Sequence, residues 1–159
     1  MDQAISNPAI SNPAISNPAI SIGTLEEVSA RDAEALARLL AQLSASAAFD
    51  VDRINEIVDH DATELLVARL GGQIVGMATF VTFPLPSGLR GHVEDVVVDD
   101  AMRGRGIARQ LLRAMTGLAR ERGLRTLDLT SRPSRESALR LYESVGFERR
   151  ATNVLRYTP

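Results

Sequence analysis

The sequence predicts a mixed α/β fold, in which helices flank a central sheet that combines antiparallel and parallel strands. Two alternating apolar segments surround the turn Gly71-Gly72, which is typical of an antiparallel hairpin. Farther along, Ile107–Glu121 carries its apolar residues on one helical face and follows an apolar strand. Another strand comes after this helix, and a strand–helix–strand unit requires parallel pairing.

The chain has 159 residues, of which 45% are hydrophobic and 24% charged, as in one ordinary globular domain. No apolar run approaches the roughly 20 residues of a membrane helix, so we expect a soluble, cytoplasmic protein without a membrane partner. Cysteine is absent and there are two histidines. This composition excludes disulfides and thiol nucleophiles, and it predicts no metal cofactor.

The first 21 residues are a repeat of Ala-Ile-Ser-Asn-Pro, complete three times over residues 4–18. Proline at every fifth position prevents a continuous helix, and one isoleucine per repeat offers little to bury. We expect residues 1–21 to be a flexible leader without a catalytic role and residues 22–159 to be the globular domain. An ordered interaction arm is the alternative.

The N-terminal half of the domain begins with a strand over residues 22–27. Ser29 and Asp32 then form a capping box. The helix that they open has apolar residues at helical spacing, namely Ala33, Leu36, Leu39, Leu40 and Leu43. A shorter helix over residues 52–58 precedes the hairpin, whose strands span residues 65–69 and 74–82. The sequence Pro-Leu-Pro-Ser-Gly predicts a loop over residues 84–88.

The C-terminal half alternates strands and helices. A strand over residues 92–98 is followed by a loop rich in glycine and arginine and by the helix Ile107–Glu121, which Gly123 ends. A strand over residues 124–130 and a helix over 134–144 come next. We expect one or two final strands over residues 147–157.

Charge is distributed unevenly along the chain. Residues 1–101 hold five arginines and fifteen acids, a net charge of −10, whereas residues 102–159 hold thirteen arginines and five acids, a net charge of +8. This asymmetry predicts an anionic partner for the C-terminal half. The three aromatic residues there are too few for a nucleic-acid stacking platform, so a phosphorylated small molecule is favoured.

The loop before the long helix has the composition of a phosphate site. Backbone amides at a helix N-terminus point toward one spot, where the helix dipole favours an anion. Gly104 and Gly106 allow close approach of a ligand, and Arg103, Arg105 and Arg109 add donors. The spacing is neither that of a dinucleotide-binding fingerprint nor that of a Walker A loop. We therefore expect the loop to hold a pyrophosphate, although a solvated turn has the same composition.

Two segments resemble the GNAT family of N-acetyltransferases. Residues 96–108 (VVVDDAMRGRGIA) are similar to its motif A, and residues 138–147 (ALRLYESVGF) to its motif B. The resemblance extends over the whole chain except the repeats. It implies a mostly antiparallel sheet, with two parallel strands that splay apart at the cofactor site, and it allows a homodimer.

The resemblance also implies acetyl-CoA as co-substrate. The backbones of Val96 and Val98 would pair with its pantetheine arm. The loop amides would hold its pyrophosphate, which assigns cofactor binding to Arg103, Gly104, Arg105, Gly106, Ile107, Ala108 and Arg109.

Two residues are expected to carry the chemistry by which an amine attacks the thioester directly. Tyr142, in motif B, is similar to the tyrosine that protonates the departing thiolate in the family, although a packed helix residue is the alternative. Glu94 is the candidate base for the amine, with an ion-paired structural role as the alternative. Since Glu94 and Asp95 are neighbours in a strand, we expect their side chains to lie on opposite faces and only one to share the site.

The acceptor is expected to be a primary amine of a small molecule. Residues 91–98 (GHVEDVVV) are similar to a strand of the glucosamine-6-phosphate N-acetyltransferases, which favours an amino sugar phosphate. A protein N-terminus, or a catalytically silent acyl-CoA sensor, is the alternative. One departure from the family is Arg135, since many members have asparagine at that position. Arg132 or Arg135 is expected to face the substrate or the phosphate on CoA instead, with solvent exposure of both as the alternative.

Overall fold

The computed structural model describes residues 19–159. Of the predicted leader, residues 1–21, the part over residues 1–18 lies outside the described residues. Five strands form one sheet in the order β1-β2-β3-β4-β5, antiparallel throughout except for the parallel pair β4–β5. This confirms the predicted fold class. The strands are β1 Ile20–Thr24, β2 Thr63–Leu70, β3 Gln73–Leu85, β4 Gly88–Val98 and β5 Thr126–Leu129.

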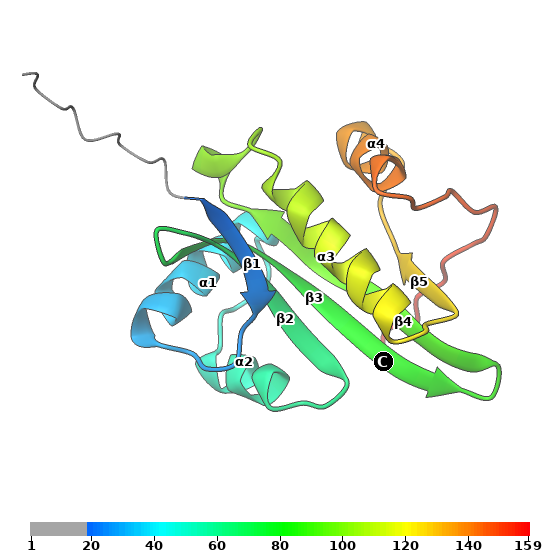
Figure 1. Cartoon of the computed structure of the whole chain (residues 1–159), viewed down its shortest axis with the longest axis horizontal. Coiled ribbons are helices and arrows are strands. Elements are labelled where there is room, and N and C mark those ends of the chain that lie inside the picture. The colour runs from blue at the N-terminus through cyan, green and yellow to red at the C-terminus, as the bar shows by residue number, and fades with distance from the viewer. Residues whose placement is uncertain (1–18) are drawn as a thin grey trace, which may run out of the picture.

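Helices cover both faces of the sheet (Figure 1). They are α1 Ala30–Leu43, α2 Val51–Val58, α3 Ile107–Glu121 and α4 Glu136–Ser144, with a short 3-10 turn at Asp100–Met102. Alternate residues of β2 face opposite sides: Leu66 packs with α3, whereas Leu65 and Val67 pack with α1. The long helix α3 and the helices α1 and α2 therefore lie on opposite faces.

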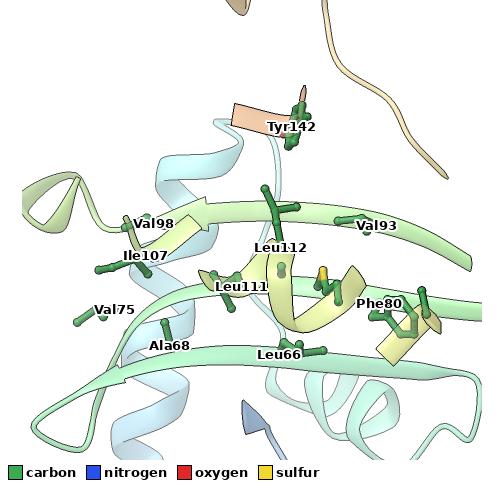
Figure 2. Close-up of a cluster of buried hydrophobic side chains, with 13 residues drawn as sticks. Leu66, Ala68, Val75, Phe80, Val93, Val98, Ile107, Leu111, Leu112 and Tyr142 are labelled. Atoms are coloured by element: carbon green, nitrogen blue, oxygen red, sulfur yellow. The ribbon is translucent and has the colours of Figure 1, made fainter. Parts of the chain in front are cut away.

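The core on the α3 side supports the predicted site. Figure 2 shows its side chains converging from β2, β3, β4 and α3, with Tyr142 at the edge of the cluster. Phe80, Leu111 and Leu112 are fully buried there. Burial of each such side chain stabilises the fold by about 1.5–3 kcal/mol. This core therefore anchors β4 and α3, the strand and the helix on either side of the Gly/Arg loop (residues 99–106).

The start of α1 is held by a buried carboxylate. Asp32 completes the predicted capping box with Ser29, and its Oδ1 accepts a 2.7 Å hydrogen bond from Arg69 of β2. The Arg69 guanidinium, followed by the Ser29 hydrogen bonds, holds the pKa of Asp32 below its ordinary value despite the opposing effect of burial. Asp32 thus ties α1 to the sheet.

We expect Asp32→Asn to lower the free energy of unfolding by roughly 1–3 kcal/mol at pH 7, because a charged buried hydrogen bond is weakened. The pKa is lower in the folded state, so the stabilising contribution is complete above the unfolded pKa and disappears as pH falls through the folded pKa. Urea titrations from pH 7 to pH 3 measure this. The exposed Glu34→Gln on the same helix is the control, and an equal effect of both variants at every pH would contradict the assignment.

Two predicted segments are wrong. Residues 84–88 are not a loop: β3 continues to Leu85 and β4 begins at Gly88, so a tight hairpin joins them. Pro84 is tolerated there because β2 pairs with β3 only as far as Val81, which leaves this end of β3 a free edge. The final strands over residues 147–157 are also absent, since that segment has no regular secondary structure and β5 is the last strand of the described chain.

Boundaries at the N-terminal side differ slightly from the prediction. β1 begins at Ile20, inside the last partial repeat, and ends at Thr24. It pairs with β2 from Ile20 to Thr24, so backbone pairing extends the strand into the repeat.

No helix of the described residues is long and apolar enough to cross a membrane.

Candidate active site

The two parallel strands separate halfway along β4. β5 pairs with β4 only from Arg90 to Val93 and ends at Leu129, whereas β4 continues to Val98. On the other side, the β3–β4 register shifts between Met77 and Thr79. The segment after Val93 therefore has no strand beside it on the β5 side, which is the opening that the resemblance implied.

A bulge in β4 changes the direction of the side chains at this opening. Asp95 has φ +53°, a left-handed conformation that is uncommon for a residue other than glycine. The predicted alternation of Glu94 and Asp95 is consequently wrong, because the bulge breaks the strand period. Both carboxylates line the same cavity of about 160 Å³.

This cavity holds the groups needed for proton transfer. Besides the two carboxylates it is lined by Tyr142 and Arg135 of the α4 region and by the apolar or neutral residues Leu43, Val93, Val96, Leu129 and Thr130. His92 Nδ1 lies 2.9 Å from Glu94 Oε1. Desolvation, and then the charge of Glu94, raise the pKa of Asp95. A carboxylate with a raised pKa is a better proton acceptor, so Asp95 joins Glu94 as a candidate base.

Tyr142 is held by packing at the inner wall of the cavity. Only 9% of it is exposed, and its ring meets Phe147 edge-on with centroids 6.2 Å apart. The Phe147 amide donates to the Tyr142 carbonyl over 3.1 Å. Burial raises the pKa of the phenol, while the charge of Arg135 acts in the opposite direction. The phenol therefore remains protonated at neutral pH, as a proton donor must.

A second cavity, of about 350 Å³, lies over the Gly/Arg loop. Gly104 and Gly106 have φ +77° and +74°, and a Cβ at either position would meet no atom within 4 Å. Gly106 is also the N-cap of α3, with no side chain to cap the helix. The first backbone amides of α3 therefore have no side-chain cap and can bind an anion.

Most predicted cofactor residues line one of the two cavities. Those at the loop cavity are Val98, Arg103, Gly104, Gly106, Ile107, Ala108 and Arg109, whereas Val96 lines the cavity of Tyr142. Arg105 lines neither. The sequence patterns did not assign Met102 and Leu141 to the loop cavity, nor Leu43, Val93, Leu129 and Thr130 to the other. Most of these are apolar residues, and periodicity in strands and helices assigns such residues to the core.

Residues 33–147 match the acetyltransferase (GNAT) family. The chain belongs to the GNAT family. The GNAT match begins within α1 and extends past the end of α4, so it includes every residue that lines either cavity.

Individual GNAT relatives have different named substrates. The chain is 40% identical over 82 residues to the N-alpha-acetyltransferase RimI of Mycobacterium tuberculosis, covering 52% of this chain and 50% of that protein. It is 38% identical over 88 residues to a glucosamine 6-phosphate N-acetyltransferase of Trypanosoma brucei brucei, covering 54% and 58%. The matched part thus spans about half the length of these curated relatives.

A solved GNAT structure matches over nearly the whole fold. The ribosomal-protein-alanine N-acetyltransferase of Brucella melitensis is 30% identical, with a TM-score of 0.69, and the match covers 87% of this chain and 99% of that one.

Among residues 19–159, no three histidine, aspartate or glutamate side chains gather as a metal site would require.

Proposed function

We propose that this GNAT protein transfers an acetyl group from acetyl-CoA to a primary amine of a small molecule. The observation that carries the proposal is the position of Tyr142. This buried phenol shares a cavity with Glu94 and Asp95 at the place where β4 and β5 part. Acid and base candidates thus meet in one space, as proton transfer between substrate and protein requires.

The residues present fit acetyl-CoA. The open cradle over Gly104 and Gly106 suits a pyrophosphate, which the amides at the start of α3 would bind, with Arg103 and Arg109 adding positive charge. β5 pairs with β4 only as far as Val93, so the β5 side of β4 at Val96 is open to an extended group such as the pantetheine arm. When bound, acetyl-CoA supplies the acetyl group as a reactive thioester.

Glu94, directly or through water, accepts the proton that the acceptor amine must lose, and Asp95 is the second carboxylate that can do so. The amine nitrogen forms a bond to the acetyl carbon as the bond from that carbon to sulfur breaks. Tyr142 donates its phenolic proton to the departing sulfur. The phenol is suited to this because burial keeps it protonated at neutral pH.

Within the small-molecule amines, we propose an amino sugar phosphate as the acceptor. The likeness to the trypanosomal glucosamine 6-phosphate N-acetyltransferase supports this choice. The likeness to RimI supports a second candidate, the N-terminus of a peptide or protein.

The test is release of CoA thiol from acetyl-CoA across a panel of amines: glucosamine 6-phosphate, an amino acid, a polyamine, an aminoglycoside and a short peptide. Turnover with at least one amine is expected, with the N-acetylated product identified by mass spectrometry. Tight binding of acetyl-CoA without turnover on any amine would contradict the proposal and favour an acyl-CoA sensor.

We also propose that the C-terminal segment contributes to a homodimer. In the part of the chain that the structure describes, β5 pairs only with β4, so its outer edge is open. Val154, Leu155 and Tyr157 are 73%, 92% and 88% exposed. Light scattering is expected to give a dimer for the full chain and a monomer for a chain ending at residue 147. A monomeric full chain would contradict this.

A further inference from the structure

We propose that Arg135 binds an anionic group of the acceptor, so that the preferred substrate is a small amine carrying a carboxylate or phosphate. This inference rests on the proposed function, since it assigns the substrate class of the same site. Glu94 and Asp95 would receive the amine, and the guanidinium would receive the anion. One cavity then recognises two opposite charges on one molecule.

Charge in the cavity is arranged for such a molecule. Arg135 is the only cation among the residues that line it, and the two carboxylates come from β4. The two carboxylates would repel an acceptor that was only anionic, and an acceptor that was only cationic would leave Arg135 without a partner. An amine with a nearby anion satisfies both ends.

Arg135 is exposed at the mouth of the site, so its side chain can be reached by a ligand. It makes no ion pair with any described residue, although two carboxylates line the same cavity, and Glu94 contacts His92 instead. A guanidinium presents a planar fork of donors that matches a carboxylate or a phosphate.

The backbone of Arg135 is fixed. Its amide donates to the Arg132 carbonyl over 3.0 Å, and its carbonyl accepts from the Leu139 amide over 3.0 Å. Its charge also acts on Tyr142, whose pKa it lowers against the effect of burial. Arg135 and Tyr142 line the same cavity, so an anion bound by Arg135 would lie in the space where the amine reacts.

The experiment compares matched acceptors that differ in the anion. Glucosamine 6-phosphate is compared with glucosamine, and an α-amino acid with its amide, each by kcat/KM of thiol release. The wild type is expected to favour at least one anionic member by about tenfold or more. Arg135→Gln and Arg135→Asn, the latter introducing the residue common in the family, are expected to lower kcat/KM for that member by roughly 10–100-fold. The neutral members should change little. Which of the two anionic members the wild type favours distinguishes phosphate from carboxylate recognition.

Arg140→Gln, on an exposed arginine of α4 outside both cavities, is the matched control and should leave all four values unchanged. Equal losses for neutral and anionic members in the Arg135 variants, or a raised KM for acetyl-CoA, would overturn the inference and assign Arg135 to the co-substrate. A wild type without preference for either anion would also overturn it. No turnover with any amine would instead refute the proposed function, and the inference with it.

Discussion

Replacing Tyr142 with phenylalanine is expected to lower kcat by about 10²–10⁴-fold, the usual contribution of a general acid. The variant loses the proton that the departing sulfur needs. It keeps the ring that packs against Phe147, so the fold and the binding of acetyl-CoA should be nearly unchanged. Steady-state thiol release and calorimetric titration with acetyl-CoA measure the two effects separately.

Tyr157→Phe is the matched control, since that tyrosine is 88% exposed in the C-terminal segment. It should leave kcat and the affinity for acetyl-CoA unchanged. If Tyr142→Phe kept most of its kcat, Tyr142 would be a packed helix residue. The raised pKa of Tyr142 adds a second expectation: the wild-type activity should not fall at high pH until above the ordinary phenol value of about 10.

Replacing Gly106 with alanine is expected to weaken acetyl-CoA binding by roughly 10–100-fold. Gly106 has φ +74°, which strains any residue with a Cβ, and the added methyl would project into the open cradle before α3. Loss of a hydrogen bond to a charged group costs about 1.5–3 kcal/mol, which corresponds to that change in Kd. Titration calorimetry measures it.

Gly117→Ala provides the control for this substitution. Gly117 lies within α3, where a Cβ would meet nothing within 4 Å. Alanine there should stabilise the helix by up to about 1 kcal/mol and leave the Kd for acetyl-CoA unchanged. An unchanged Kd in Gly106→Ala, with the thermal melt intact, would show that the pyrophosphate does not depend on this loop.

Local signals were sufficient to predict most of the fold. The capping box at Ser29 and the Gly71-Gly72 hairpin each depend on residues close in sequence, and the periodicity of α3 is strong. The parallel pair β4–β5 followed from the intervening helix. Gly104 and Gly106 could be singled out for the same reason, because the positive φ that each adopts is a property of its own segment.

The features that the sequence did not predict depend on pairing between residues far apart in the chain. The bulge that places Asp95 in the same cavity as Glu94 arises from the β3–β4 register, which no short pattern encodes. The strand at Pro84 is possible because β2 ends its pairing at Val81. Leu43 enters the cavity because α1 ends beside it, although its spacing is that of a core residue.

The position of CoA in a crystal structure of the complex tests both cavities at once. We expect its pyrophosphate on the amides of residues 103–109, its pantetheine arm along β4 beyond Val93, and its sulfur within hydrogen-bond distance of the Tyr142 hydroxyl. CoA bound elsewhere, or with its sulfur away from Tyr142, would contradict the assignment of the cavities and of the acid.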